Sequence, residues 1–269
     1  MCDAAAHDRD RDRRLMASLA EIVSYLDDLL EPARFKDYCP NGLQVPGRDD
    51  VRTIVTGVSA SAELFERAAA VQADAIIVHH GLFWAGAPLQ LDRPAAHRLK
   101  LLLGRDCSLL AYHLPLDGHQ EHGNNALLAT ALGCDSWRPF PEGESPAIGV
   151  AATFPGDGID AGTLITRARE ATGGRAPLAF TGGPEAIRTI GIVSGGGSSY
   201  LGAAIGEGLD AFLTGEPVER VMVQANEAAI HFLAAGHYAT ETFGVRRLGD
   251  LLAERFGVEH HFADVPNPI

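Results

Sequence analysis

Apolar positions in the first part of the chain repeat with the period of a helix. Residues 16–30 read MASLAEIVSYLDDLL, and their apolar side chains recur every three or four positions, as one buried helix face requires. Ser18 and Glu21 have the spacing of a capping box, and Pro32 cannot continue a helix. The pattern predicts an amphipathic helix that begins at about Ser18 and ends before Pro32.

Apolar runs and amphipathic segments then alternate along the chain. The predicted strands are residues 51–59, 74–81 and 107–117, the last including an exit loop, and the predicted helices are residues 63–73, 95–106 and 124–133. Such alternation is typical of α/β proteins, in which a mainly parallel sheet is covered by helices. Residues 139–146 are rich in Pro, Gly and Glu and indicate a boundary, beyond which strands and helices alternate again.

The two halves of the chain contain a repeated pattern. VRTIVTGV begins at Val51 and leads to Asp74 in ADAIIVHHG, and IRTIGIVS begins at Ile187 and leads over the same interval to Asp210 in LDAFLTGEP. Coincidence between similar β-α-β units is the alternative to a duplication. We therefore expect an α/β fold with two similar lobes. The predicted division is a flexible tail at 1–15, a first lobe at 16–140 plus 230–269, and a second lobe at 141–229.

Composition and charge exclude several classes of protein. The 269 residues are 46% hydrophobic, enough for a large core, and no apolar run reaches the ~20 residues of a membrane helix. The formal net charge of −13 disfavours nucleic acid as a partner. The N-terminus has no apolar stretch of a secretory signal, so we expect a soluble, cytoplasmic protein. The four cysteines are too far apart for a zinc ribbon, which predicts reduced, mostly buried thiols.

Three groups of metal-binding residue types follow apolar strands. His79 and His80 end IIVHH, and Gly81 after them allows a turn that would bring both imidazoles to one site. Asp117 lies in the next exit loop. His237 and Glu241 have the i, i+4 spacing that places two ligands on one helix face. Each group alone could be an ordinary polar surface, but the three together favour a metal site.

Other polar residues near these groups are candidates for proton transfer or for positioning the ligands. They are His113, His119 and His122 around Asp117, and Glu216, which the repeated pattern aligns with His80. The same alignment places His113 where His237 stands. The glycine-rich loop SGGGSSY, which starts at Ser194, could bind a phosphate or could be a tight turn needed for close packing.

The number of candidate ligands bears on the number of ions. Three histidines and two carboxylates exceed the three protein ligands of a typical mononuclear catalytic site and suit two bridged ions. Nitrogen and oxygen donors fit zinc, manganese or iron. Two divalent ions would leave a positively charged site that attracts an anionic small molecule. We expect this site in the crevice between the lobes, with most ligands from the first lobe.

Several longer segments carry a resemblance to a known family. They are PNGLQVPG at 40–47, IVTGVSAS at 54–61, ADAIIVHHGLFW at 73–84, YHLPLDGH at 112–119, GNNALLA at 123–129, SGGG at 194–197, DAFLTGE at 210–216, AAGHYATE at 234–241 and DVPNP at 264–268. From about residue 16 to residue 269 the chain resembles the dinuclear-metal-centre family of GTP cyclohydrolase I type 2 proteins.

The resemblance implies a ligand set and an assembly. It implies that His80 and Asp117 hold one ion, that His79 and His237 hold the other, and that Glu241 contacts both. It also implies a toroidal homohexamer whose sites face an internal cavity.

The activity that the resemblance implies is hydrolysis of GTP, with a metal-bound hydroxide opening the guanine ring. A non-catalytic metal-delivery or regulatory scaffold and a dinuclear phosphohydrolase need the same ligands. The sequence does not separate these three functions, nor does it identify the metal.

Overall fold

The computed structural model describes residues 16–269, so the predicted tail at 1–15 lies outside the described part of the chain. The chain forms two compact units. Unit 1 comprises residues up to His113 together with Val245–Val265, and unit 2 comprises Leu114–Gly244 with Pro266–Ile269. Within the described residues, no helix is long and apolar enough to cross a membrane.

Unit 1 is built on a five-stranded sheet of order β13-β4-β5-β6-β2. Its elements are β1 (Ala17–Ser18), α2 (Leu19–Leu30), η1 (Pro32–Arg34), β2 (Gly42–Val45), β3 (Asp50–Val51), β4 (Thr53–Ser59), α3 (Ala62–Ala70), β5 (Ala75–His80), α4 (Arg93–Leu103), β6 (Ser108–Ala111) and β13 (Glu259–Phe262). Only β2 runs antiparallel to its neighbour, so this sheet is mainly parallel, as predicted. The first helix has the predicted capping box between Ser18 and Glu21.

The core of unit 1 explains why its strands are almost continuously apolar. One sheet face, with Val55, Ile76 and Val78, packs against Leu64 of α3 and Leu102 of α4. The residues that alternate with them on β4 and β5 are fully buried as well. A strand that is covered on both faces needs apolar side chains at every position.

Unit 2 is built on a six-stranded mixed sheet of order β7-β8-β10-β11-β12-β9. Its elements are α5 (Leu114–Gly118), α6 (Asn124–Ala131), β7 (Ser136–Phe140), β8 (Gly149–Thr153), α7 (Ala161–Ala171), β9 (Leu178–Thr181), β10 (Thr189–Val193), η2 (Gly197–Tyr200), α8 (Leu201–Gly206), β11 (Ala211–Thr214), α9 (Val221–Glu227), β12 (His231–Ala234) and α10 (His237–Thr240). The central strands β10, β11 and β12 are parallel, and the outer pairings are antiparallel. Helix α11 (Thr242–Phe256) begins in unit 2 and continues into unit 1.

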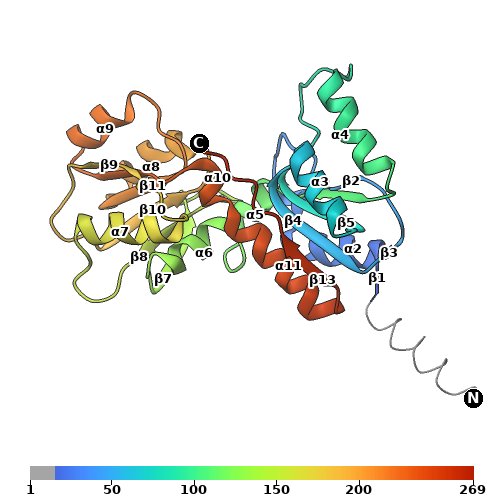
Figure 1. The fold of residues 1–269 in the computed structure, drawn as a ribbon. Helices are drawn as coiled ribbons and strands as arrows, with labels where there is room; N and C mark the ends of the chain where they lie inside the picture. The colour runs from blue at the N-terminus through green and yellow to red at the C-terminus, as the bar shows by residue number, and fades with distance from the viewer. Residues whose placement is uncertain (1–15) are drawn as a thin grey trace, which may run out of the picture. The chain divides into compact units, whose positions relative to one another are not determined.

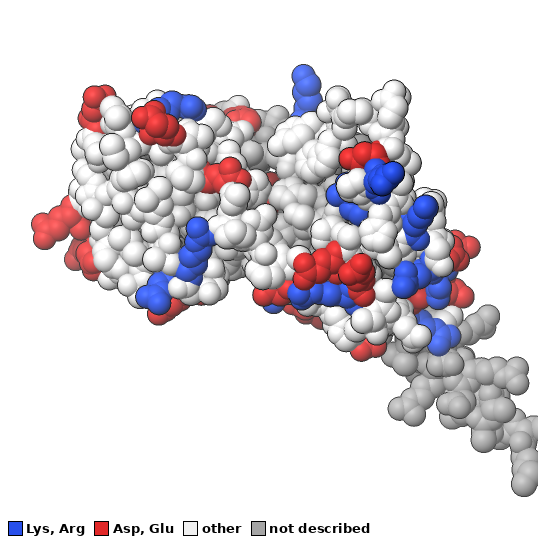
Figure 2. Space-filling view, turned by 45° about the horizontal axis from the view of Figure 1, so that its top comes forward, with Lys and Arg blue, Asp and Glu red and all other residues white. Residues whose placement is uncertain are grey.

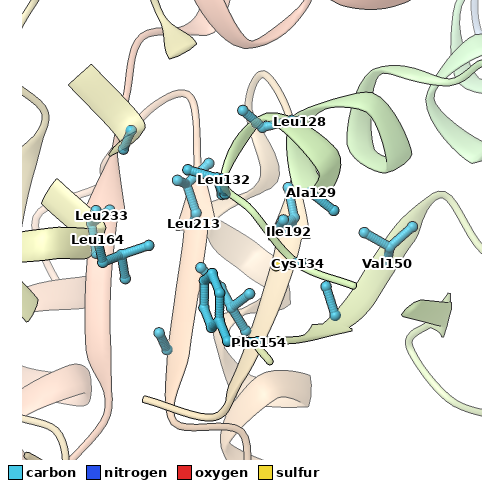
Figure 3. Packing of buried hydrophobic residues seen from close by; sticks show 14 of the residues in the cluster. Leu128, Ala129, Leu132, Cys134, Val150, Phe154, Leu164, Ile192, Leu213 and Leu233 are labelled. Carbon is cyan, nitrogen blue, oxygen red and sulfur yellow. The ribbon is translucent and has the colours of Figure 1, made fainter. Parts of the chain in front are cut away.

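Helices cover both faces of this second sheet (Figure 1). Leu213 of β11 packs in one cluster with Leu128 of α6 and Leu164 of α7, which Figure 3 shows from close by. Its neighbour Phe212 points to the opposite face and packs with residues of α8 and α9. The expected α/β fold with two units is therefore confirmed. The sheet of unit 2 is not mainly parallel as predicted, because three of its pairings are antiparallel and two are parallel.

The boundary between the units differs from the predicted one. The Pro- and Gly-rich segment 139–146 does not separate the units, because it joins β7 and β8, which pair antiparallel as a hairpin within unit 2. Strand β12 is central to the sheet of unit 2, so residues 231–234 belong there rather than with the first lobe. The division assigns His79 and His80 to unit 1 and assigns Asp117, His237 and Glu241 to unit 2.

The repeated sequence pattern corresponds to a repeated structure. In unit 1, Asp74 Oδ2 accepts the backbone N–H groups of Arg52 and Thr53 at 2.9 and 3.1 Å. In unit 2, Asp210 Oδ2 accepts those of Arg188 and Thr189 at 2.8 and 2.9 Å. Each aspartate thus ties the start of one parallel strand to the start of the preceding strand.

The strand register agrees with this correspondence and corrects one detail of the alignment. Ile54 pairs with Ala75 in unit 1, and Ile190 pairs with Ala211 in unit 2, so Glu216 occupies the position of His80. In the next strand Ser108 corresponds to His231. His113 therefore corresponds to Gly236, and the predicted match between His113 and His237 is wrong by one residue.

Figure 2 shows acidic and basic side chains interspersed on one face of the molecule, without a continuous basic surface on that face.

Candidate metal centre

His79 and His80 occupy the carboxyl end of β5 in unit 1. His79 is fully buried, and its Nδ1 lies 3.0 Å from the carbonyl oxygen of Tyr112. A carbonyl can only accept, so Nδ1 carries the proton and the lone pair is on Nε2. His80 Nδ1 lies 3.0 Å from the hydroxyl of Ser59, and the two imidazole centroids are 4.7 Å apart. Both rings are thus held through Nδ1, which leaves Nε2 as the atom that could coordinate a metal.

His113 joins this pair within unit 1. Its ring centroid lies 4.9 Å from that of His79 and 5.6 Å from that of His80. The three histidines each offer one ligand atom, and these atoms lie within 4.8 Å of one another. Such a group could hold a divalent ion.

Asp37 orients His113, and the sequence did not predict this role. Its Oδ1 lies 2.9 Å from His113 Nδ1, and its side chain is only 3% exposed. Burial acts to raise the pKa of Asp37, but hydrogen bonds from His113, the Cys39 N–H and Asn41 outweigh it and lower that pKa below its usual range. The ionised carboxylate accepts from His113 Nδ1, so Nε2 of this ring also carries the lone pair.

The PNGLQ segment supports the turn that follows the two histidines. Gln44 Oε1 accepts the N–H of Leu82 at 2.8 Å, and Gln44 Nε2 donates to the carbonyl of Pro40 at 2.8 Å. A Cβ at Gly81 would collide with the Gln44 amide, so the close approach of Gln44 in β2 to the turn after β5 requires glycine there. Trp84 Nε1 donates to the carbonyl of Gly81 at 3.1 Å. These bonds fix the backbone immediately after His80.

In unit 2, His237 lies between two carboxylates. It begins α10, and its Nε2 lies 3.1 Å from Glu241 Oε1, so the i, i+4 spacing brings the two side chains together as predicted. Its Nδ1 lies 2.5 Å from Glu216 Oε1. Burial acts to lower the pKa of His237, but the hydrogen bonds and negative charges of Glu241 and Glu216 prevail and raise it to about 9.

Asp117 is held by a network of buried polar groups in unit 2. It lies in the short helix α5 rather than in a loop, and its Oδ1 accepts from Asn124 Nδ2 at 2.8 Å and from Ser194 Oγ at 3.0 Å. Asn125 accepts the N–H of Ser194 at 2.7 Å and donates to the carbonyl of Ile148 at 2.6 Å. Asn124 and Asn125 therefore connect Asp117 to the end of β10.

The glycine-rich loop packs closely against Glu241. Gly195 has φ +58°, and a Cβ there would collide with the Glu241 carboxylate. Its carbonyl accepts the N–H groups of Gly215 and Glu216, both at 2.9 Å. These contacts favour the close-packing interpretation of the loop over phosphate binding.

His119 makes contacts with the residues that closely follow it in the chain. Its Nδ1 accepts the N–H groups of Glu121 and His122 at 3.2 and 3.0 Å, and its ring stacks on that of His122 with centroids 5.0 Å apart. It is not one of the residues that the described structure groups as possible metal ligands.

Comparison with known proteins identifies the chain. The family model for Duf34/NIF3 (NGG1p interacting factor 3) matches residues 17–268, nearly the whole chain. The chain belongs to the Duf34/NIF3 family. This confirms the resemblance found in the sequence, because curated relatives of this Duf34/NIF3 protein are named GTP cyclohydrolase 1 type 2 homolog.

Two of these relatives show how complete the match is. The Pseudomonas aeruginosa protein is 45% identical over 251 residues, which cover 93% of this chain and 98% of the relative. The Escherichia coli K12 protein is 42% identical over 254 residues, which cover 92% and 98%.

Solved structures agree with the fold of this Duf34/NIF3 chain. The structure titled protein ybgI, of unknown function, has a TM-score of 0.88 at 38% identity and covers 94% of this chain and 100% of its own. TTHA1606 from Thermus thermophilus has a TM-score of 0.85 at 36% identity, with the same coverage.

The donor atoms of this Duf34/NIF3 chain fit divalent metal ions. His79, His113 and His237 each have Nδ1 bound to a group that accepts a proton, which is how proteins orient imidazole ligands for metals. Histidine nitrogen and carboxylate oxygen together suit zinc, manganese or iron(II).

Proposed function

We propose that this protein is a dinuclear metal-dependent hydrolase that opens a cyclic C–N bond in an anionic substrate, with GTP as the leading candidate. The observation that carries the proposal is that the three histidines it assigns as ligands, His79, His80 and His237, are held through Nδ1 by Tyr112, Ser59 and Glu216, so that each points Nε2 away from its anchor. Anchors of this kind are what a metal centre needs in order to bind its ions tightly and in one geometry. The name shared by the relatives supplies the substrate class.

The proposal assigns the ligands as the sequence resemblance implied. His79 and His80 of unit 1, and Asp117, His237 and Glu241 of unit 2, would together hold two ions. When bound, such ions supply Lewis-acid charge and activate water at neutral pH. The protein's own groups would hold the ligands in place and move protons.

Two residues have distinct roles in this scheme. His113 lies beside His79, is oriented by Asp37 and would transfer a proton to or from the substrate. Glu216 keeps the Nδ1 proton on His237 and acts as a positioning residue.

The experiment is a turnover assay with metal-reconstituted, full-length protein. A panel of nucleotides is incubated with the protein, and formate and phosphate are measured separately. Release of formate supports the cyclohydrolase function. Release of phosphate alone indicates a dinuclear phosphohydrolase, and the absence of both indicates a non-catalytic metal-binding or delivery scaffold.

Substitution of Glu241 tests the ligand assignment independently of turnover. Glu241→Ala is expected to reduce the metal content below that of wild type, whereas Glu227→Ala, at an exposed position on α9, leaves the content unchanged. Elemental analysis that finds full metal content in Glu241→Ala contradicts the assignment of Glu241 as a ligand of both ions.

The proposal also includes a toroidal homohexamer and a cytoplasmic location, as the sequence resemblance and composition led us to expect. Size-exclusion chromatography with light scattering measures the assembly directly. A monomeric mass at micromolar concentration would refute the hexamer without affecting the metal-binding assignment.

A further inference from the structure

Unit 2 contains a cavity of about 280 Å³ beside the carboxylate that anchors His237. It lies at the carboxyl ends of β11 and β12, which is the edge where open α/β sheets bind their ligands. Its walls are formed by Arg175 and Leu178, by residues 215–217 and 234–236, and by Pro268 and Ile269.

The cavity is connected to the candidate metal centre through two chain segments. Glu216, which lines it, bonds through Oε1 to His237 Nδ1. Gly236, which also lines it, directly precedes His237 and has φ +100°. A molecule in this cavity would therefore contact the residues that hold His237 in place.

The chemical character of the walls is apolar with one charge of each sign. Leu178, Pro217 and Ile269 contribute apolar surface, and Glu216 contributes a carboxylate. Arg175 is exposed, and within residues 16–269 it makes no hydrogen bond or ion pair, so its guanidinium is available to an anion. Apolar walls around a hydrogen-bond acceptor suit a planar heterocycle with N–H groups at its edge, and the cation suits phosphate.

We propose that this cavity binds the base of a guanine nucleotide, with Glu216 accepting N–H groups of the base and Arg175 contacting the phosphates. The inference rests on the proposed function for its substrate class, and it adds a base-binding site outside the reacting centre, since no assigned metal ligand lines the cavity. The volume is at the lower end of the ~300–1,000 Å³ of cavities that enclose a drug-sized ligand, which favours the base over the whole nucleotide. At about 280 Å³ the cavity encloses a base and leaves the ribose and phosphates to extend toward exposed Arg175.

Glu216 would also discriminate between purines. Guanine presents the N1–H and the amino N–H groups side by side, and both can donate to one carboxylate. Adenine presents an unprotonated N1 there, which faces the carboxylate with lone pair against lone pair. A site built to accept hydrogen bonds rejects an analogue that lacks the donors.

The test measures binding of GDP, guanosine and ADP to the metal-loaded, full-length protein by isothermal titration calorimetry. Leu178→Trp, which fills the cavity, is expected to weaken binding of GDP and guanosine at least about 10-fold. Arg175→Ala is expected to weaken GDP about 10-fold and to leave guanosine unchanged, because only GDP carries phosphates. Met222→Trp and Arg188→Ala, at exposed positions of unit 2 outside the cavity, serve as matched controls. Metal content is expected to stay at the wild-type value in all four variants.

The possible results separate this inference from the proposed function. If wild-type protein binds no GDP, or if both cavity variants bind GDP as wild type does, the cavity is not the subsite, even where formate is released. If the cavity variants lose GDP binding but wild type releases no formate, the subsite stands and the hydrolase function falls. Glu216→Gln is expected to reduce the preference for GDP over ADP, and an unchanged preference would refute the role of Glu216 in specificity.

Discussion

Gly195 offers a test of how unit 2 holds Glu241. The residue has φ +58°, and a Cβ placed on it would collide with the Glu241 carboxylate and lie 3.0 Å from His237 Nε2. Gly195→Ala therefore introduces two separate effects, a backbone cost and a displacement of the carboxylate. Gly156→Ala is the matched control, since Gly156 has φ +65° and open space where its Cβ would stand.

The backbone cost lowers stability with or without metal, whereas the displaced carboxylate also reduces the stabilisation that bound metal provides. An alanine in the left-handed region costs about 1–2 kcal/mol, so Gly156→Ala should lose about this much stability without metal, and Gly195→Ala should lose at least as much, because it also displaces the buried carboxylate. This corresponds to a decrease in Tm of roughly 2–8 °C in a domain of this size. A displaced carboxylate should weaken metal binding by at least about 10–100-fold, by analogy with the loss of groups that orient ligands. In excess metal, that loss removes about 1.4–2.7 kcal/mol of ligand-induced stabilisation in Gly195→Ala alone.

The assay is thermal unfolding of wild type and both variants, with chelator and with saturating zinc or manganese. Metal should raise the Tm of Gly156→Ala as much as that of wild type and raise the Tm of Gly195→Ala by several degrees less. An equal rise in the two variants would refute the argument that Gly195 is glycine because Glu241 needs its space.

The remaining predictions concern stability, thiol reactivity and metal affinity. Asp74→Ala and Asp210→Ala should each cost about 1–3 kcal/mol in urea unfolding, because each leaves two backbone N–H groups without their acceptor, whereas exposed Asp157→Ala should cost under about 0.5 kcal/mol. Burial raises the pKa of the Cys107 and Cys134 thiols to about 12. In a Cys2→Ser protein at pH 8, a thiol-specific alkylating reagent should therefore modify these two cysteines at least about 1,000-fold more slowly when the protein is folded than when it is unfolded. Because the folded state retains these protons, their contribution to stability should be complete below about pH 8.5 and lost as the pH rises toward 12. Gly81→Ala should displace Gln44 and lower metal affinity. Gly86→Ala, where a Cβ meets open space, should leave metal affinity unchanged. Equal metal affinities in the two variants would contradict the role assigned to the contact between Gln44 and Gly81.

The central strands and most helices could be predicted from the sequence because their burial is recorded in local periodicity. β5 and β11 are buried at every position but the last of β5, and their unbroken apolar runs identify them. β2 and β9 were missed, since they are antiparallel edge strands of four residues whose side chains are partly exposed. Their pairing depends on the neighbouring strand rather than on their own sequence.

Candidate site residues could be recognised in the sequence only where they follow apolar strands. His79, His80 and His237 each follow or end such a strand, and that position attracts attention in a sequence. Asp37 has no such signal, because it lies in a loop 76 positions from His113 and its burial depends on the folded arrangement. The role of Gln44 was hidden for the same reason, since its contact with Gly81 joins β2 to a turn far away in the chain.

The structural repeat places different side chains at one equivalent position in the two units. His80 and Glu216 occupy the same place at the end of equivalent parallel strands. In unit 1 the residue there is an imidazole anchored by Ser59 and grouped with two further histidines. In unit 2 it is a carboxylate that anchors His237 instead. Equivalent strand ends thus provide a candidate ligand in one unit and the support for a candidate ligand in the other.

On this argument, exchanging the two side chains in a double variant, His80→Glu with Glu216→His, should not preserve the site. The carboxylate introduced into unit 1 would have the Ser59 hydroxyl as its partner, and the group of three histidines would lose one of its ligand nitrogens. The imidazole introduced into unit 2 could not keep the proton on His237 Nδ1 as an ionised carboxylate does. Elemental analysis of the double variant should therefore find less metal than in wild type, and full metal content would show that the two strand ends are interchangeable.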